Sequence, residues 1–301
     1  MTDGCLPIRS IGIFFFFIFL TLPLLGMEPL RVACVGDSNT EGFRGMWSHA
    51  TENNYPAVLQ RLLGPAYDVV NLGSSGATMS KGGMDGGNVA SYWERPQFQK
   101  LLDGGWDIVI ICLGTNDSKT KASGHTTDNW FGGVPLEGAD VSLHLREQLM
   151  ATNPTYANSY ASMVSIVRTL GNERNDGQPE IFLCVPIPVM ADGAYQLSQP
   201  IINGVLPRFV PLLAQALGIP STHVIDLFTV LGGQEIADVP ADGWLEPGGP
   251  GSCKWYRDEA WGDNTHPSDA GYITMAEAIH ATLIKAAGQV QAGSSGSCAV
   301  V

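Results

Sequence analysis

Five continuous apolar runs divide the chain and predict five buried β-strands. The runs are rich in β-branched residues and lack the apolar/polar alternation of a strand with one wet face. They are therefore typical of strands covered on both sides in a parallel sheet. The runs occupy residues 30–35, 67–72, 106–113, 180–185 and 222–227.

Between these runs, and after the last of them, apolar residues recur at helical spacing. Pro207 and Pro211 fall inside one of these segments and should kink or divide it, because proline cannot donate the backbone hydrogen bond of a helix interior. The predicted helices are residues 55–63, 97–102, 155–170, 199–217 and 268–287.

The alternation of strands and helices predicts an α/β fold. We expect a three-layer α/β/α sandwich around a central five-stranded parallel sheet, with right-handed crossovers. A single domain should cover residues 27–287, followed by a flexible, Gly/Ser-rich tail over 288–301. Residues 118–150 and 232–263 show no clear element, and we interpret them as binding loops or lids, because loops of this length in a compact domain are usually functional.

The first 26 residues differ from the rest of the chain. Arg9 precedes the apolar stretch IGIFFFFIFLTLPLLG, which has the length of a signal peptide and is short for a membrane span. We interpret residues 1–26 as a secretory signal, which implies a secreted protein or one in the secretory-pathway lumen. An uncleaved signal anchor, which would tether the protein to a membrane, is the alternative.

The composition and charge of the chain limit the classes of partner that it is expected to bind. Hydrophobic residues make up 45% of the sequence and charged residues 15%, so the chain can bury a sizeable core, and the net charge is −13 with no run of Lys and Arg. Nucleic acids and anionic membrane surfaces bind clustered cations. We therefore expect no nucleic-acid partner, and no stable membrane partner unless the leader is uncleaved.

The six cysteines do not form the framework of a disulfide-rich protein. Cys34, Cys112 and Cys184 each lie inside an apolar run, where a cysteine commonly behaves as a small buried hydrophobe. Cys253 and Cys298 lie in polar, irregular sequence and could pair in a secreted protein. The sixth cysteine belongs to the leader.

Small and polar residues follow three of the predicted strands directly. GDSN (36–39) follows the first strand, GSSG (73–76) the second and GTND (114–117) the third, while DNTHP (263–267) precedes the final helix. Ligands bind to open α/β sheets beyond the carboxyl ends of the strands. The four segments should therefore converge on one rim of the sheet.

These segments contain the groups that nucleophilic catalysis needs. A serine hydroxyl requires a base within hydrogen-bond reach and a third group that orients the base. Ser38 is the candidate nucleophile, His266 the candidate base and Asp263 the orienting carboxylate. Attack on a carbonyl carbon creates an oxyanion, for which the backbone N–H groups of Ser38 and Gly73 and the amide of Asn116 are candidate donors.

Each residue also has a structural interpretation. Ser38 could cap a helix, Asp263 could cap the turn before the final helix, and Gly73 could be a turn glycine that still provides its N–H. We interpret Asp37 and Asn39 as turn formers that support the nucleophile. The presence of all four segments favours the catalytic interpretation of Ser38.

No cofactor is implied by the sequence. The chain contains no HExxH, no CxxC pair and no G-x-x-x-x-G-K-[ST] loop, which would indicate a zinc or nucleotide site. It also lacks the G-x-S-x-G elbow of the α/β-hydrolases. We therefore expect neither a metal nor a nucleotide to take part.

In order, GDSN, the glycine of NLGSSG, GTND and DNTHP resemble the four sequence blocks of the SGNH (GDSL-like) hydrolases, from about residue 30 to about residue 287. The resemblance implies a flavodoxin-like fold and a serine esterase that forms an acyl-enzyme. NLGSSGATMSKGG, LGTNDSK and FLCVPIPV are further similar to the carbohydrate acetylesterases related to sialate O-acetylesterase and acetylxylan esterase. That branch implies removal of O-acetyl groups from a small-molecule or polysaccharide ester.

Other functions remain open. A lipase-like or thioesterase-like enzyme for longer acyl chains, a transferase and a catalytically idle carbohydrate-binding protein could all be built on the same segments. Trp93 and Trp130 could contact a sugar substrate, as could Tyr92 and Trp244, although core packing is the commoner role of large aromatic residues.

Overall fold

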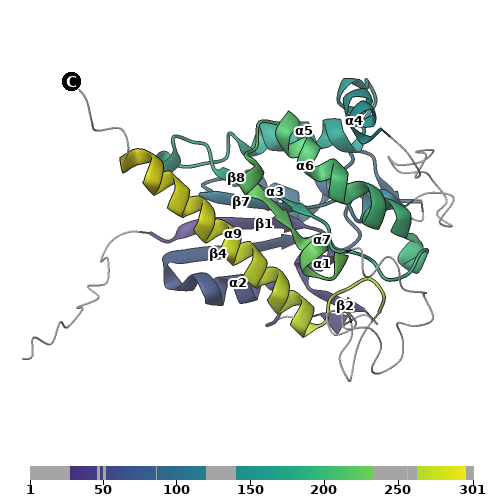
Figure 1. Ribbon diagram of the computed structural model, residues 1–301, viewed down its shortest axis with the longest axis horizontal. Helices are drawn as coiled ribbons and strands as arrows, with labels where there is room; N and C mark the ends of the chain where they lie inside the picture. Colours follow the sequence, from purple (N-terminus) through teal and green to yellow (C-terminus); the bar gives the residue numbers. More distant parts are fainter. Residues whose placement is uncertain are drawn as a thin grey trace, which may run out of the picture.

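A five-stranded parallel sheet forms the centre of the protein in the computed structural model (Figure 1). The strand order is β4-β1-β7-β8-β9, and all neighbouring strands are parallel. Each of the five apolar runs contains one of these strands, so the predicted sheet is confirmed. The strands are β1 Leu30–Gly36, β4 Tyr67–Gly73, β7 Ile108–Cys112, β8 Glu180–Val185 and β9 Val224–Asp226.

The structure describes most of the chain that follows the predicted leader. Several predictions lie outside the described residues: the leader itself, the Cys253–Cys298 pair, Trp130 and Trp244. In the part of the chain that is described, no helix combines the length and apolar character needed to cross a membrane. The described residues are 28–45, 48–49, 52–85, 87–119, 140–233, 256 and 263–295.

Helices cover both faces of the sheet and complete three layers (Figure 1). On one face, α2 and α9 pack against alternate strand residues such as Val32 and Cys34. On the other face, α3, α5 and α6 pack against the intervening residues, such as Ala33 and Val35. Both sides of each central strand are therefore buried, which explains the unbroken apolar runs. The helices are α1 Ser38–Glu41, α2 Tyr55–Leu63, α3 Pro96–Leu102, α4 Val141–Met150, α5 Tyr156–Val167, α6 Leu206–Ala216, α7 Leu227–Val230 and α9 Asp269–Ser295.

The boundaries of two helical segments depart from the simplest prediction. Residues 199–217 divide, as the prolines indicated, into a π-helix over Pro200–Val205 and α6, which begins at Leu206. Helix α9 continues to Ser295, past Gly288, where the predicted tail begins. A single glycine weakens a helix without ending it.

Helix α4 was not predicted, because the segment 118–150 showed no clear element. Asp140 begins the helix by accepting hydrogen bonds from the backbone N–H groups of Ser142 and Leu143, both at 3.0 Å. Few side chains of α4 are buried, so the apolar spacing that reveals a helix in a sequence is weak here.

The cysteines also differ from their prediction. Cys112 in β7 and Cys184 in β8 form a disulfide across neighbouring strands, with Cα atoms 4.9 Å apart, rather than acting as separate apolar side chains. Cys34 is buried and unpaired. The pairing depends on β7 lying beside β8 in the sheet, which the apolar pattern of each strand does not encode.

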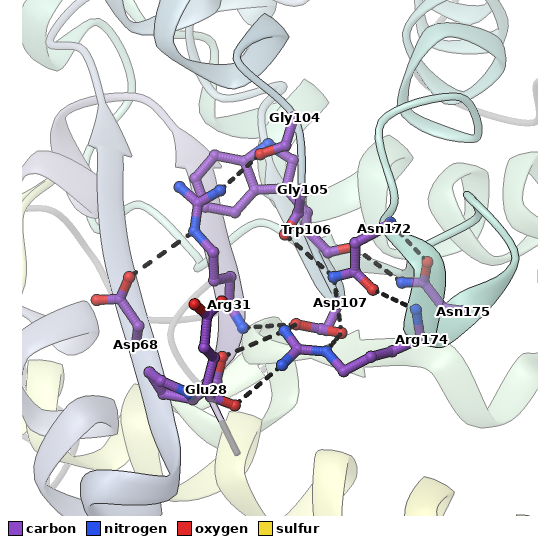
Figure 2. Close-up of polar contacts among 11 residues, drawn as sticks. Glu28, Arg31, Asp68, Gly104, Gly105, Trp106, Asp107, Asn172, Arg174 and Asn175 are labelled. Carbon is purple, nitrogen blue, oxygen red and sulfur yellow. Dashed lines mark hydrogen bonds and ion pairs between the residues drawn. The ribbon is translucent and has the colours of Figure 1, made fainter. Parts of the chain in front are cut away.

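A polar cluster closes the amino end of the sheet (Figure 2). Asp107, which is 8% exposed, accepts hydrogen bonds from the backbone N–H of Arg31 at 2.8 Å and the amide of Asn172 at 3.0 Å. The Arg174 guanidinium donates two further hydrogen bonds to Asp107, at 2.7 and 3.1 Å. The Arg31 guanidinium lies 4.2 Å from the centroid of the Trp106 ring. The cluster joins the starts of β1 and β7 to the loop that precedes β8.

Replacement of Asp107 by alanine should lower the free energy of unfolding by about 3 kcal/mol, because several donors lose their buried acceptor. Urea unfolding measures the change. Asp68→Ala is the matched control: this carboxylate also contacts Arg31, at 3.8 Å, but its side chain is 51% exposed, so its loss should cost less than about 0.5 kcal/mol. Equal losses in the two variants would contradict the importance of the buried cluster.

Candidate active site

Ser38 is the first residue of α1, directly after β1. The turn is formed by Asp37, whose Oδ1 accepts the backbone N–H of Asn39 at 3.0 Å and whose carbonyl accepts the N–H groups of Thr40 and Glu41. Asp37 and Asn39 are both buried, and the structure places them in the supporting turn that the sequence predicted. Ser38 is thereby presented at the start of the helix, at the carboxyl end of the strand.

Three of the predicted residues form a continuous hydrogen-bonded chain. The Ser38 Oγ lies 3.0 Å from His266 Nε2, and His266 Nδ1 lies 2.8 Å from Asp263 Oδ2. Since a carboxylate only accepts hydrogen bonds, Nδ1 carries the proton, and Nε2 of the neutral imidazole accepts from the Ser38 hydroxyl. This geometry suits transfer of the hydroxyl proton to His266.

The Asp263 carboxylate is held on both oxygens. Its Oδ1 accepts the backbone N–H groups of Thr265 at 2.8 Å and His266 at 2.6 Å, and its Oδ2 accepts the Tyr195 hydroxyl at 2.8 Å beside the imidazole. Burial alone would raise the pKa of Asp263, but the hydrogen bonds that it accepts from the His266 side chain and from the backbone of His266 and Thr265, together with its electrostatic interaction with His266, outweigh burial and hold this pKa below its usual value. Asp263 is therefore an anion at neutral pH.

Two aromatic rings contact the imidazole of His266. The Phe43 ring lies 4.6 Å from it between centroids, at a tilted angle, and the Tyr195 ring lies 5.1 Å from it in an edge-on arrangement. His266 is 5% exposed. The imidazole is therefore confined by packing as well as by its hydrogen bonds.

Gly73, predicted as an oxyanion donor, does not face the site. Its N–H donates to Asn71 Oδ1 at 2.9 Å. A Cβ at this position would lie 2.1 Å from the backbone nitrogen of Glu41. Gly73 thus allows α1 to pack closely on β4, and this prediction is corrected.

Gly76 lies on the wall of the pocket beside Ser38 instead. It occupies the third position of a turn that is closed by a hydrogen bond from the N–H of Ala77 to the carbonyl of Ser74. Its φ is +73°, a conformation that favours glycine at this turn position. The second glycine of GSSG, rather than the first, therefore presents its backbone to the pocket.

Asn116 follows β7 and lines the same pocket. Its Nδ2 donates to the carbonyl of Ala77 at 3.2 Å and lies 3.5 Å from Asp37 Oδ2, at the outer limit of a hydrogen bond. The amide is therefore held between the segments that follow β1, β4 and β7. The structure brings Asn116 to the position on the rim that the sequence predicted.

Two buried carboxylates organise the loops around the pocket. Asp117 accepts the N–H of Met79 at 2.8 Å and both the N–H and the hydroxyl of Ser80, at 2.9 and 2.6 Å. Burial raises the pKa of Asp117 to about 6, and it raises that of Asp37 to about 6 as well, against the opposing effects of the Asn39 N–H and of His266. These acids shape the loops and do not line the pocket.

The pocket encloses about 410 Å³ next to the Ser38 hydroxyl. One part of its wall is apolar, with the side chains of Phe43, Tyr195 and Leu197. Another part carries an ion pair, in which Lys119 Nζ lies 2.7 Å from Asp85 Oδ2. Among the described residues, no group of three His, Cys, Asp or Glu side chains could hold a metal ion.

Trp93 lies apart from this pocket, contrary to its prediction as a substrate-binding residue. Its indole N–H donates to the carbonyl of Met79 at 2.8 Å, and its ring packs against Phe98 and lies 4.2 Å from Lys81 Nζ. Tyr92 is fully buried. Both aromatic residues therefore serve packing.

Several residues of the pocket were not predicted from the sequence. Gly76 had a signal, because glycine in a Ser-Ser-Gly turn commonly supplies a positive φ. Phe43, Lys119 and Tyr195 had none, because their approach to His266 and Ser38 depends on how loops from distant parts of the chain fold together.

The model of the GDSL-like lipase/acylhydrolase family matches residues 34–272 of the chain. The chain belongs to this family. A curated relative, an acetylxylan esterase of Xylanibacter ruminicola, is 27% identical over 264 residues, which are 87% of this chain and 45% of that protein. The GDSL-like chain thus spans less than half the length of this relative.

Solved structures share the fold of this GDSL-like protein. An aryl esterase of M. smegmatis has a TM-score of 0.52 at 18% identity, over 85% of this chain and 99% of that chain. A carbohydrate acetylesterase family member from Sinorhizobium meliloti has a TM-score of 0.51 at 18% identity, over 84% of this chain and 97% of that one. At these identities the likeness concerns the fold alone, and it confirms the predicted α/β architecture.

Asp37→Asn should change the pH dependence of stability. The pKa of Asp37 rises from 3.8 to about 6 on folding. Between pH 6 and pH 3.8, the native state therefore binds a proton that the unfolded state does not, and the wild-type protein gains stability as the pH falls through 6. The asparagine variant keeps the acceptor for Asn39 and buries no charge, so it should be more stable than wild type at pH 8, by about 3 kcal/mol. Urea unfolding should show this advantage disappear near pH 4, and a constant difference would contradict the assignment.

Proposed function

We propose that this chain is a serine esterase that forms an acyl-enzyme on Ser38. The observation that carries the proposal is the unbroken hydrogen-bonded chain from the Ser38 hydroxyl through His266 to Asp263, at 3.0 and 2.8 Å. It lies beside a pocket that can admit a substrate. A capping serine or a surface histidine would not need this alignment.

In the first half-reaction, Ser38 Oγ attacks the carbonyl carbon of an ester while His266 Nε2 takes the hydroxyl proton. The negative charge of Asp263 stabilises the imidazolium that results. As the tetrahedral intermediate collapses, the bond from carbon to the alcohol oxygen breaks, and Nε2 returns the proton to that oxygen. The alcohol leaves, and the acyl group remains esterified to Ser38.

Water completes the cycle through the same histidine. His266 Nε2 takes a proton from water as the water oxygen attacks the acyl carbon. Collapse of this second intermediate breaks the bond to Ser38 Oγ, which regains the proton from His266. The products are a carboxylic acid and the free enzyme.

The oxyanion of each intermediate would be stabilised by donors from three loops. Ser38 and Gly76 provide backbone N–H groups at the edge of the pocket, and neither N–H donates to another group in the described part of the chain. Asn116 would add a third donor from the segment after β7 by turning toward the oxyanion the Nδ2 hydrogen of its long, 3.5 Å contact with Asp37 Oδ2, while the other hydrogen stays on the carbonyl of Ala77. The two backbone donors are held in place before reaction and stabilise developing charge without reorganising.

We further propose that the natural substrate is an O-acetylated carbohydrate. Two observations support this finer assignment: the similarity to an acetylxylan esterase, and the ion pair on the pocket wall between the buried Lys119 and the more exposed Asp85. Lys119 presents donors and Asp85 presents acceptors, a combination that suits hydroxyl groups better than a long alkyl chain. The apolar wall at Phe43 and Leu197 would accommodate a short acyl group.

The test compares initial hydrolysis rates of aryl acetate, butyrate and octanoate esters and of an acetylated xylo-oligosaccharide. We expect acetate to be the fastest aryl ester, acetate release from the oligosaccharide, and a loss of roughly 10⁴-fold or more in kcat/KM for Ser38→Ala. A preference for octanoate would contradict the acetylesterase assignment and favour a lipase-like enzyme. Equal rates for wild type and Ser38→Ala would contradict catalysis at this site altogether.

A further inference from the structure

Tyr195 contacts the Asp263–His266 pair from a loop that carries none of the four catalytic segments. Its hydroxyl lies 2.8 Å from Asp263 Oδ2, the same oxygen that accepts from His266 Nδ1. Burial and the hydrogen bond to Asp263 raise the pKa of Tyr195, so the phenol keeps its proton and acts as the donor. Two donors therefore share one carboxylate oxygen.

The backbone at Tyr195 adopts a costly conformation. Tyr195 has φ 50° and Gln196 has φ 63°, and residues other than glycine rarely occupy this left-handed region. Such conformations persist where the surrounding structure holds them, and they concentrate at functional sites. Tyr195 is nevertheless 48% exposed, so burial of apolar surface does not account for the conformation.

The loop is fixed to itself and to the turn that carries the catalytic pair. The N–H of Gly193 donates to the carbonyl of Leu197, and the N–H of Gln196 donates to the carbonyl of Gly193, both at 2.9 Å. The N–H of Met190 donates to the carbonyl of Asn264 at 2.8 Å. These hydrogen bonds hold the loop of Tyr195 beside the turn that carries Asp263 and His266.

We propose that Tyr195 is a positioning residue that sets the basicity of the Asp263–His266 pair, an inference that rests on the proposed esterase function. By donating to Oδ2, the phenol withdraws negative charge from the atom that stabilises the imidazolium. The carboxylate then stabilises the imidazolium less than it would without the phenol. The edge-on ring of Tyr195 also restrains the imidazole.

Other titratable groups act on the same pair. Asp37 interacts electrostatically with His266 from the turn after β1, and Tyr256 and Tyr272 interact with Asp263. Burial raises the pKa of both tyrosines well above the usual value, so they stay neutral. On the pocket wall, the Asp85 carboxylate is paired with Lys119. None of these groups is altered when the Tyr195 hydroxyl is removed, so a change in pH dependence would report on Tyr195 itself.

The experiment compares wild type, Tyr195→Phe and a matched control, Tyr67→Phe, in which a hydroxyl is removed at the start of β4, at the opposite end of the sheet. The first readout is the downfield proton NMR signal of the His266 Nδ1 proton in the resting protein. The second is the pH profile of kcat/KM with an aryl acetate. We expect Tyr195→Phe to move both the pH of the NMR transition and the acidic limb of the profile to higher values, by about half a unit.

Tyr67→Phe should match wild type in both measurements. An NMR transition at the wild-type pH in Tyr195→Phe would overturn the inference, whatever the activity. Failure of the proposed function is distinguishable, because it would appear as esterase activity that survives Ser38→Ala, while the NMR measurement on the Asp263–His266 pair needs no turnover. A Tyr195→Phe protein that loses kcat/KM equally at every pH would also contradict a role in basicity.

Discussion

The candidate active site depends on β1 lying between β4 and β7 in the parallel sheet. Because all three strands point the same way, their carboxyl ends bring Ser38, Gly76 and Asn116 to one rim, although these residues come from separate parts of the sequence. The chain places β4 on one side of β1 and the later strands β7, β8 and β9 on the other. At such a change of direction in the strand order, the connections diverge and leave a crevice at the rim. The location of the site is therefore set by the order of the strands rather than by any single side chain.

Around that crevice, most of the polar side chains hold loops rather than face a substrate. Asp37 builds the turn that presents Ser38, and Asp117 fixes the segment at Met79 and Ser80. Burying these carboxylates costs free energy, as their raised pKa values indicate. The cost is offset by hydrogen bonds that keep the loops in one conformation, which a site with preorganised donors requires.

The sequence was sufficient to predict the strands, most of the helices and the meeting of Ser38, Asp263 and His266, because each depends on local patterns and on the general rules of parallel sheets. The sequence was insufficient where contacts between residues far apart in the chain determine the structure. In GSSG, the turn position of Gly76 can be read from the sequence, but the role of Gly73 depends on the close packing of α1 on β4. The Cys112–Cys184 bond, the packing of Trp93 and the approach of Tyr195 to Asp263 likewise depend on contacts between distant segments.

Catalysis at this site requires Ser38 to be an activated nucleophile, which covalent labelling with an alkyl fluorophosphonate would reveal. Attack by the serine oxygen on phosphorus expels fluoride and leaves a stable adduct that peptide mass spectrometry locates. We expect stoichiometric labelling of Ser38 in the native protein, in step with loss of esterase activity, and no labelling of the urea-unfolded protein or of His266→Ala. Labelling of another serine, or activity that survives complete modification of Ser38, would contradict this role of Ser38.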